Sequence, residues 1–271
     1  MPTIHHLDGA TLRPAGGLEL VGADELVSHV LVIELGSRLV LVDAGIGLAD
    51  VASPIERLGA EFCELSGPVL DADRTVARQL GSLGLVADQV TDVLVTHPDL
   101  DHVGGLADVP QARVHAHPDA VTAVRHPTEP RDIDRVHAAQ WAHEVEWAPA
   151  PTPRAPWHGL DAWSLDDFGD DIVMVGLPGH ATGHVGYAVR NGGGWLLHAG
   201  DAYFHRAAVA GGEVPPGLEI FEGIVEQDRA ARLDTVARLR ALPPEVTVVC
   251  SHDPIELAGV RERGASPRPG V

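Results

Sequence analysis

Residues 96–105 read THPDLDHVGG, and they place four potential metal ligands within six positions directly behind an apolar run. These ligands are His97, Asp99, Asp101 and His102. Imidazole and carboxylate groups suit a borderline divalent ion such as zinc, whose bonds to them are about 2.0–2.2 Å long. A packed core has no use for so many polar groups in one short stretch. The decapeptide therefore predicts a metal site before any other kind of site.

Composition limits the possible partners. The chain has 271 residues, 45% of them hydrophobic, which is ordinary for one α/β domain spanning residues 1–271. Its formal net charge of −20 argues against nucleic acid and anionic membrane, because binding to either would need a basic patch. No apolar stretch approaches the roughly 20 residues that cross a bilayer. We expect a small-molecule substrate, with no nucleic-acid partner and no membrane partner.

Cysteine usage and the first residues bear on location. Cys63 and Cys250 are too few for a disulfide framework, and residues 1–6 lack the basic and apolar regions of a signal peptide. Together these two observations predict a cytoplasmic protein.

The candidate ligands stand just past the ends of predicted strands. A β-hairpin is expected over residues 30–35 and 38–43, and it ends at Asp43. Further strands are predicted over residues 92–95, 112–116, 172–175, 185–189, 194–198 and 246–250, and helices over residues 73–83 and 226–242. This pattern indicates an α/β fold in which one edge gathers residues from distant parts of the sequence.

Residues 127–156 differ in composition from the rest of the chain, because they are rich in proline, tryptophan and mixed charge. We interpret this segment as an inserted lid or wall within the single domain, and not as a second domain.

Five motifs in a fixed order resemble the metallo-β-lactamase superfamily of hydrolases. Besides Asp43 and the HxDxDH run of residues 97–102, they are PGH at residues 178–180, GD at 200–201 and SH at 251–252. The resemblance extends from about residue 25 to residue 255, and it is nearest to lactonase and glyoxalase II-like members. It implies an αββα sandwich, in which two mixed β-sheets are flanked by helices.

The resemblance also implies a ligand set for two divalent ions. The first ion would be held by His97, Asp99 and His180, and the second by Asp101, His102 and His252. Asp201 would bridge the two ions, and Asp43 would steady the metal loop. His184 is expected to brace its loop instead of binding metal. Zinc is the expected ion, with iron or manganese as alternatives where Asp99 coordinates.

Position 99 departs from the superfamily's common pattern, which has histidine there. The flavo-diiron oxidoreductases of the superfamily carry a carboxylate at this position, so Asp99 is expected to coordinate; the alternative is a loop carboxylate that points away and leaves one ion. With Asp99 coordinating, three aspartates and a hydroxide balance the charge of two divalent ions, and the centre is formally neutral. A neutral centre in an acidic chain predicts an uncharged carbonyl substrate.

For the reaction, the resemblance implies hydrolysis of a lactone, ester or thioester by a hydroxide that bridges the two metals. Asp101 and Asp201 would act in catalysis by orienting this nucleophile, and Tyr203, or His205 in its place, would protonate the leaving group. β-Lactam or phosphodiester hydrolysis at the same site is the first alternative. A di-iron redox enzyme and a binding protein without catalytic activity are the others. The resemblance also suggests a homodimer.

Overall fold

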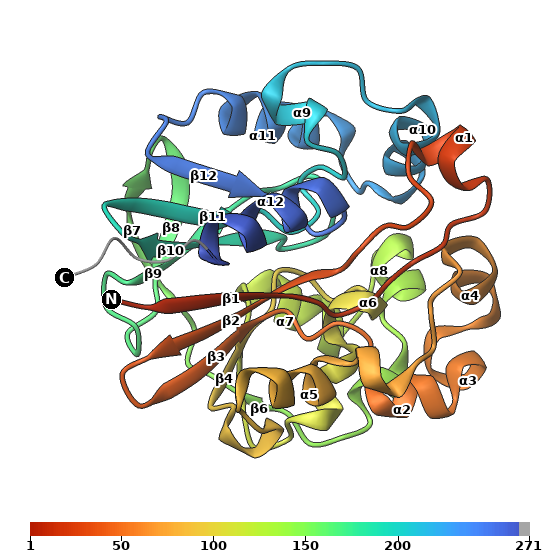
Figure 1. The fold of residues 1–271 in the computed structure, drawn as a ribbon, viewed down its shortest axis with the longest axis horizontal. Coiled ribbons are helices and arrows are strands. Elements are labelled where there is room, and N and C mark those ends of the chain that lie inside the picture. Colours follow the sequence, from red (N-terminus) through yellow and green to blue (C-terminus); the bar gives the residue numbers. More distant parts are fainter. Residues whose placement is uncertain (266–271) are drawn as a thin grey trace.

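Two six-stranded β-sheets face each other in the computed structural model, which describes residues 1–265 (Figure 1). The first sheet is built from the N-terminal part of the chain, and its strands lie in the order β1 (Thr3–Asp8), β2 (His29–Leu35), β3 (Arg38–Val42), β4 (Asp92–Leu94), β5 (Arg113–His115) and β6 (Glu146–Trp147). Strands β1 to β3 pair antiparallel, whereas β3 to β6 pair parallel. This sheet is therefore mixed.

The second sheet comes from the C-terminal part of the chain. Its strands lie in the order β12 (Val246–Val249), β11 (Gly194–His198), β10 (Val185–Asn191), β9 (Ile172–Gly176), β8 (Leu160–Ser164) and β7 (Thr152–Trp157). Only β11 and β12 pair parallel among these described strands, and the other neighbours are antiparallel. The predicted αββα sandwich of two mixed sheets is thus confirmed.

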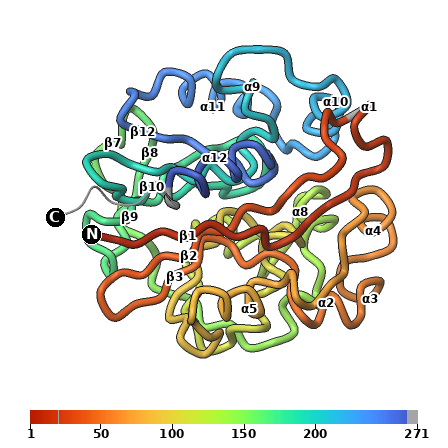
Figure 2. The backbone as a smooth tube through the Cα atoms, in the orientation of Figure 1, coloured from red at the N-terminus to blue at the C-terminus, as the bar shows by residue number. Residues whose placement is uncertain are grey.

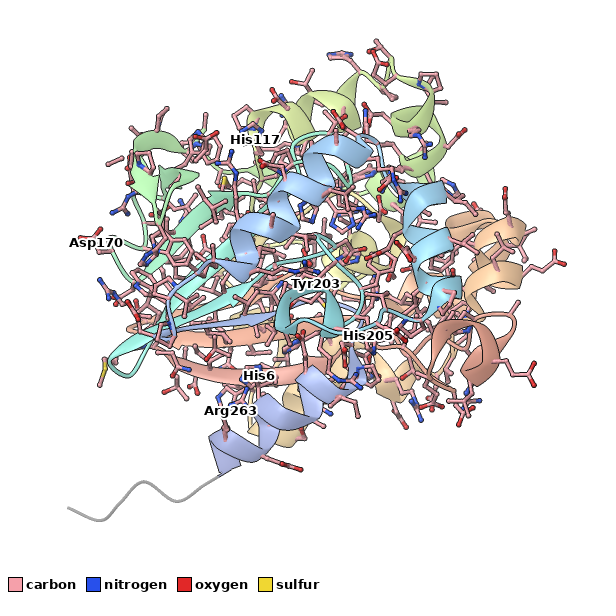
Figure 3. All side chains as sticks on the ribbon, turned by 90° about the horizontal axis from the view of Figure 1, so that it is seen from above. His6, His117, Asp170, Tyr203, His205 and Arg263 are labelled. Carbon is pink, nitrogen blue, oxygen red and sulfur yellow. The ribbon has the colours of Figure 1, made fainter. Side chains whose placement is uncertain are left out.

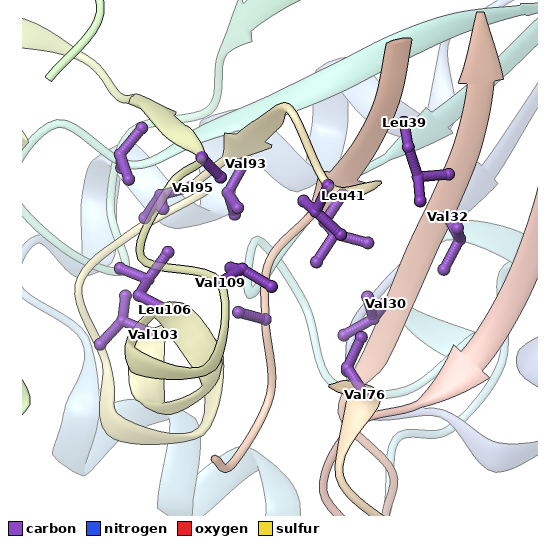
Figure 4. Close-up of a cluster of buried hydrophobic side chains, with 14 of the residues drawn as sticks. Val30, Val32, Leu39, Leu41, Val76, Val93, Val95, Val103, Leu106 and Val109 are labelled. Atoms are coloured by element: carbon purple, nitrogen blue, oxygen red, sulfur yellow. The ribbon is translucent and has the colours of Figure 1, made fainter. Parts of the chain in front are cut away.

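Side chains of β2 show why both faces of the first sheet are apolar. Successive residues of a strand point to opposite faces. Leu31 and Ile33 accordingly pack between the two sheets, while Val30 and Val32 pack outward against helices (Figure 4). Strands buried on both faces need a continuous apolar run, which is what residues 30–33 provide.

Helices cover both outer faces of the sandwich. The first sheet is covered by α5 (Val76–Gln79), α6 (Leu100–Val103), η4 (Gly104–Asp108) and α7 (Pro118–Arg125). The second sheet is covered by α9 (Ala207–Ala210) and α11 (Arg229–Arg240), and α12 (Pro254–Ala265) packs along β1. Among the described residues, no helix is long and apolar enough to span a membrane.

A further group of short helices lies at one end of the sandwich, at the right of Figures 1 and 2. Its members are α1 (Gly17–Val21), α2 (Leu48–Ala52), α3 (Pro54–Leu58), α4 (Ala60–Ser66), α8 (Pro130–Arg135) and α10 (Pro216–Val225). An apolar cluster that includes Leu58, Leu100, Phe204 and Leu218 joins several of them. This end therefore has its own small core beside the ligand loops.

The predicted hairpin is confirmed, because Leu35 pairs with Arg38 across a two-residue turn. Two predicted helices are wrong in extent. Residues 73–83 form three short pieces, η1 (Ala72–Arg74), α5 and η2 (Leu80–Leu83), because Thr75 is extended with φ −67° and ψ 148°. Residues 226–242 contain only α11, which begins after Asp228 caps it by accepting a hydrogen bond from the Ala231 amide at 2.9 Å.

Segment 127–156 takes part in both sheets. After α8 it forms η5 (Ala138–Trp141) and then β6, the edge strand of the first sheet; its last residues begin β7, the edge strand of the second. The segment is thus the crossover from one sheet to the other, and α8 lies at the end of the molecule where the ligand loops meet.

Candidate metal centre

Four connections at one end of the sandwich carry the seven predicted ligands. They are the segment after β4 with His97, Asp99, Asp101 and His102, the β9–β10 loop with His180, the β11–α9 loop with Asp201, and the β12–α12 loop with His252. The structure brings all seven together in two groups whose potential ligand atoms lie within 4.8 Å of one another: His97, Asp99, His180 and Asp201, and then Asp101, His102 and His252. We call these the first and second clusters.

The first cluster has the spacing of a tetrahedral metal site. Ligand atoms about 2.1 Å from a tetrahedral ion stand about 3.4 Å from one another. His97 Nε2 lies 3.4 Å from Asp99 Oδ2 and 3.6 Å from Asp201 Oδ2. His180 Nε2 lies 3.2 Å from Asp99 Oδ2 and 3.6 Å from Asp201 Oδ2. Asp99 therefore points into the cluster and not away from it.

Asp201 connects the two clusters. Its Oδ2, which faces the first cluster, is 3.0 Å from His252 Nε2, and its Oδ1 is 3.4 Å from His102 Nε2. Asp101 Oδ2 lies 3.8 Å from both of these imidazole nitrogens. One carboxylate thus faces histidines of both clusters, as a bridging ligand would.

Several polar atoms of the two clusters are buried without partners. His97 Nε2, His102 Nε2, Asp99 Oδ1 and Asp201 Oδ1 have no hydrogen bond within the described part of the chain. Such orphaned atoms are costly unless something binds them. Since nitrogen and oxygen donors are the ligands that zinc and related ions take, the residues fit a divalent metal ion.

Asp43 organises histidines of both clusters from behind. Its Oδ2 accepts hydrogen bonds from His102 Nδ1 and from Thr96 Oγ1, each at 2.8 Å, and Thr96 Oγ1 lies 2.9 Å from His97 Nδ1. These bonds hold the Nδ1 edge of both rings, so that each Nε2 faces the clusters. This geometry gives Asp43 the supporting position expected for it.

Other core groups orient the remaining ligands. His252 Nδ1 bonds the Val27 carbonyl at 2.7 Å, and Ser28 Oγ donates to the backbone oxygen of Asp101 at 2.9 Å. His184 links two ligand loops, because its Nδ1 bonds the Leu177 carbonyl at 2.7 Å and its Nε2 accepts from the Asp201 amide at 3.0 Å. His184 therefore braces the site, as the sequence predicted.

Burial and charge shift the imidazole pKa values in opposite directions. Burial, helped by the Arg135 guanidinium, lowers the pKa of His180 to about 4. Burial also opposes protonation of His252, but the Asp201 carboxylate outweighs it and raises the pKa to about 9. A metal ion binding at the second cluster would therefore displace a proton.

Arg135 reaches the first cluster from outside the sandwich, and sequence reasoning missed it. Its Nη1 donates to Asp99 Oδ2 at 2.5 Å, and its Nη2 donates to the His180 carbonyl at 3.0 Å. Burial would raise the pKa of Asp99, but the charges of Arg135 and His97 hold it well below its usual value. With two divalent ions and a hydroxide bound, the guanidinium would add one positive charge to the formally neutral set of ions and ligands.

Tyr203 does not lie with the metal ligands. Its side chain is fully buried in the core outside the second sheet, and its hydroxyl donates to Glu256 Oε1 at 3.1 Å (Figure 3). The structure therefore does not bring Tyr203 to the two clusters, and its role as a proton donor stays a prediction. The next residue, Phe204, faces the site. The Phe204 ring lies 4.7 Å from the His252 ring and 5.9 Å from the His180 ring. His205 is partly buried, and its Nδ1 accepts from the Ala207 amide at 3.2 Å.

The glycine pair after His102 allows a close approach between segments. A side chain at Gly105 would place its Cβ 2.3 Å from the Ala44 carbonyl oxygen, and one at Gly104 would meet Asp50 Oδ2 at 2.0 Å. Only glycine lets the metal loop pack against the segment that follows Asp43.

A third group of possible ligands, Asp92, His115 and Asp167, is already neutralised. Arg38 Nη1 donates to Asp92 Oδ2 at 2.8 Å, and Arg113 Nη2 lies 3.0 Å from oxygens of both aspartates. This group is an ion-pair network, in contrast to the unsatisfied first and second clusters.

Comparisons with known proteins agree with this architecture. A family model of the metallo-beta-lactamase superfamily matches residues 23–252. The chain is 35% identical over 257 residues to a probable metallo-hydrolase of Mycobacterium tuberculosis, covering 93% of this chain and 80% of that protein. Over 161 residues it is 32% identical to a hydroxyacylglutathione hydrolase of Vibrio parahaemolyticus, covering 59% of this chain and 47% of that protein.

A solved structure shares the fold. An N-acyl homoserine lactone hydrolase, with its product bound at the catalytic metal centre, superposes with a TM-score of 0.63 at 14% identity, covering 94% of this chain and 95% of that one. Paired sheets with ligand loops at one end define a metal-dependent class of hydrolases. The chain belongs to the metallo-β-lactamase superfamily.

Proposed function

We propose that the protein is a dinuclear metal-dependent hydrolase that cleaves the acyl bond of a small lactone, ester or thioester. The observation that carries this proposal is the shared carboxylate of Asp201, which stands 3.6 Å from His97 Nε2 and 3.0 Å from His252 Nε2. Two ions held at these spacings would lie on either side of one acidic group. Zinc is the proposed ion at both positions, with iron or manganese as alternatives beside Asp99.

Different residues would bind the metal ions and orient the attacking water molecule. His97, Asp99 and His180 would hold one ion, Asp101, His102 and His252 the other, and Asp201 both. Divalent ions in such a site lower the pKa of a water molecule and polarise a carbonyl oxygen. The side chains of Asp101 and Asp201 are almost fully buried, and they would orient the attacking water molecule between the two clusters. Phe204 is buried and forms an apolar wall beside the imidazoles of His180 and His252.

The acyl bond is favoured by the relatives. A curated relative that is 32% identical over 161 residues is named as a hydrolase of hydroxyacylglutathione. The lactone within the proposed class has the weaker support, since the lactone hydrolase shares only the fold at 14% identity. Charge no longer selects among these substrates, because Arg135 adds a positive charge to the centre. A carboxylate-bearing acyl substrate therefore belongs to the proposed range.

The test combines metal analysis with a substrate panel. Protein loaded with Zn²⁺ and freed of excess ion is analysed for metal, and acid release is measured with lactones, thioesters, esters, an aryl phosphodiester and a cephalosporin. The proposal predicts two ions per chain and the highest kcat/KM on an acyl substrate. A preference for the phosphodiester or the cephalosporin would overturn the acyl proposal. An iron-loaded protein that consumes oxygen and hydrolyses none of the panel would overturn hydrolysis itself.

A further inference from the structure

Arg135 is the one side chain of helix α8 that enters the candidate metal centre among the contacts of the described residues. It is the last residue of that helix, and only 10% of its side chain is exposed. Besides Asp99 and the His180 carbonyl, its guanidinium donates to the Val225 carbonyl at the end of α10. Three hydrogen bonds, in each of which Arg135 is the donor, thus fix the guanidinium beside the first cluster. Its Nη1 also lies 3.1 Å from His180 Nε2, a contact that a bound ion would replace.

The oxygen that Arg135 contacts is the one that faces the cluster. Asp99 Oδ2 lies 3.4 Å from His97 Nε2 and 3.2 Å from His180 Nε2, whereas Asp99 Oδ1 is buried without a partner. A single carboxylate oxygen therefore contacts the arginine and also faces the imidazoles of the first cluster. Arg135 determines which way this carboxylate points.

Asp99 has a competing local position. It is the N-cap residue of α6, with φ −71° and ψ 153°, yet its side chain makes no capping hydrogen bond. Aspartate at an N-cap ordinarily turns its carboxylate onto the first amides of the helix, which stabilises the helix. Without Arg135 the carboxylate would be free to cap α6, and the first cluster would lose a ligand.

We infer that Arg135 is a positioning residue for the first metal, which holds the Asp99 carboxylate in ligating orientation and balances its charge. Asp99 and Arg135 then act as a pair that contributes no net charge to the centre. An imidazole at position 99 would be neutral by itself and would need no such partner. This inference rests on the metal centre of the proposed function but not on the substrate.

Arg131 provides a matched control on the same helix. Its Nη1 donates to the Ile224 carbonyl, one residue before the carbonyl that Arg135 contacts, so it also anchors α8 to α10. Arg131 makes no contact with Asp99 among the described hydrogen bonds and ion pairs. Loss of Arg131 therefore reports on the anchoring of α8 alone.

The experiment measures Zn²⁺ binding in the full-length protein, without using activity. Arg135→Gln, Arg131→Gln, Asp99→His and the double variant Asp99→His/Arg135→Gln are loaded with Zn²⁺ and titrated against a chromophoric chelator. We expect the wild type and Arg131→Gln to bind two ions alike. Arg135→Gln should lower the affinity for one of the two Zn²⁺ ions by about 10–100-fold, the usual effect of losing a group that orients a metal ligand. The double variant should bind both ions as tightly as Asp99→His does.

Three results of the Zn²⁺ titrations would contradict the inference. Unchanged or tighter binding in Arg135→Gln would show that the arginine does not prepare the site. Equal losses in Arg135→Gln and Arg131→Gln would assign the effect to the anchoring of α8, and so would a double variant that still lacks one ion. Thermal unfolding of the chelated proteins identifies any variant that fails to fold. A wild type that binds two ions but hydrolyses no acyl substrate would overturn the proposed activity and leave this inference standing.

Discussion

The two clusters of the metal centre are built in different ways. The second cluster is oriented by the core of the sandwich, because His102 bonds Asp43, His252 bonds the Val27 carbonyl and Asp101 bonds Ser28. The first cluster shares the Asp43 support through Thr96 and His97, but its Asp99 depends on Arg135, which comes from the crossover between the sheets. The second cluster is thus oriented by residues of the sandwich core, whereas the first cluster also depends on the position of helix α8. The second should therefore bind its ion more tightly, and the first should respond to changes in α8.

The largest effect is expected from His102→Ala, which removes a ligand of the cluster that the core supports. The variant should bind one ion fewer, and turnover should fall by well over the roughly 100-fold that loss of an orienting partner costs. Metal analysis and kcat/KM on the best acyl substrate measure both effects. His126→Ala is the control, since His126 is exposed and belongs to neither cluster among the described residues. Equal behaviour of the two variants would contradict the assignment of His102 as a ligand.

Asp43→Asn should weaken the binding of both Zn²⁺ ions, whereas Arg135→Gln should weaken the binding of only one. Asp43 Oδ2 accepts from His102 and from the Thr96 hydroxyl, and Oδ1 accepts from the Thr96 amide. The single oxygen of an asparagine cannot accept all three bonds. We expect about 10–100-fold weaker Zn²⁺ binding at each site, measured by chelator competition. Loss confined to one ion would mean that Asp43 does not join the two clusters.

Glu256→Gln tests a half-buried carboxyl group outside the two clusters. Burial, with Asp253 nearby, raises the pKa of Glu256 to about 7 against the opposing hydrogen bond from the Cys250 amide. An acid whose pKa is higher in the folded state stabilises the fold at low pH, and this stability is lost as the pH rises from 4.5 to about 7. The variant should therefore be more stable than the wild type at pH 8, by about 1–3 kcal/mol, and match it near pH 4. A stability difference that does not vary with pH would contradict this.

Tyr203→Phe should have the smallest effect and should leave the metal centre untouched. Its hydroxyl bonds Glu256 on the outer side of the second sheet, so its removal should cost about 1 kcal/mol of unfolding free energy. Urea denaturation measures that loss, while kcat/KM and Zn²⁺ content should equal those of the wild type. A clear fall in kcat with normal stability would support Tyr203 as a proton donor.

The same comparison explains what could be predicted from the sequence. His97 to His102 form a dense local motif, and the other ligands follow strands, so their convergence could be expected from the order of the elements. Arg135 carries no such signal, because it lies in a mixed polar segment 36 residues beyond Asp99, and only the packing of α8 brings the two together. Tyr203 lies away from the ligands although Phe204 faces them, and the residues after β11 have no periodic pattern that shows which side chain does so. Helix 73–83 failed because no pattern revealed the extended Thr75.

Anomalous scattering from crystals of the Zn²⁺-loaded protein tests the dinuclear centre most directly. We predict two peaks, one within each cluster, with the Asp201 carboxylate between them and with Arg135 in contact with Asp99. A single peak in the second cluster, with the Asp99 carboxylate turned onto the amides of α6, would contradict a dinuclear centre. Peaks only at the Asp92, His115 and Asp167 network would contradict the assignment of the centre altogether.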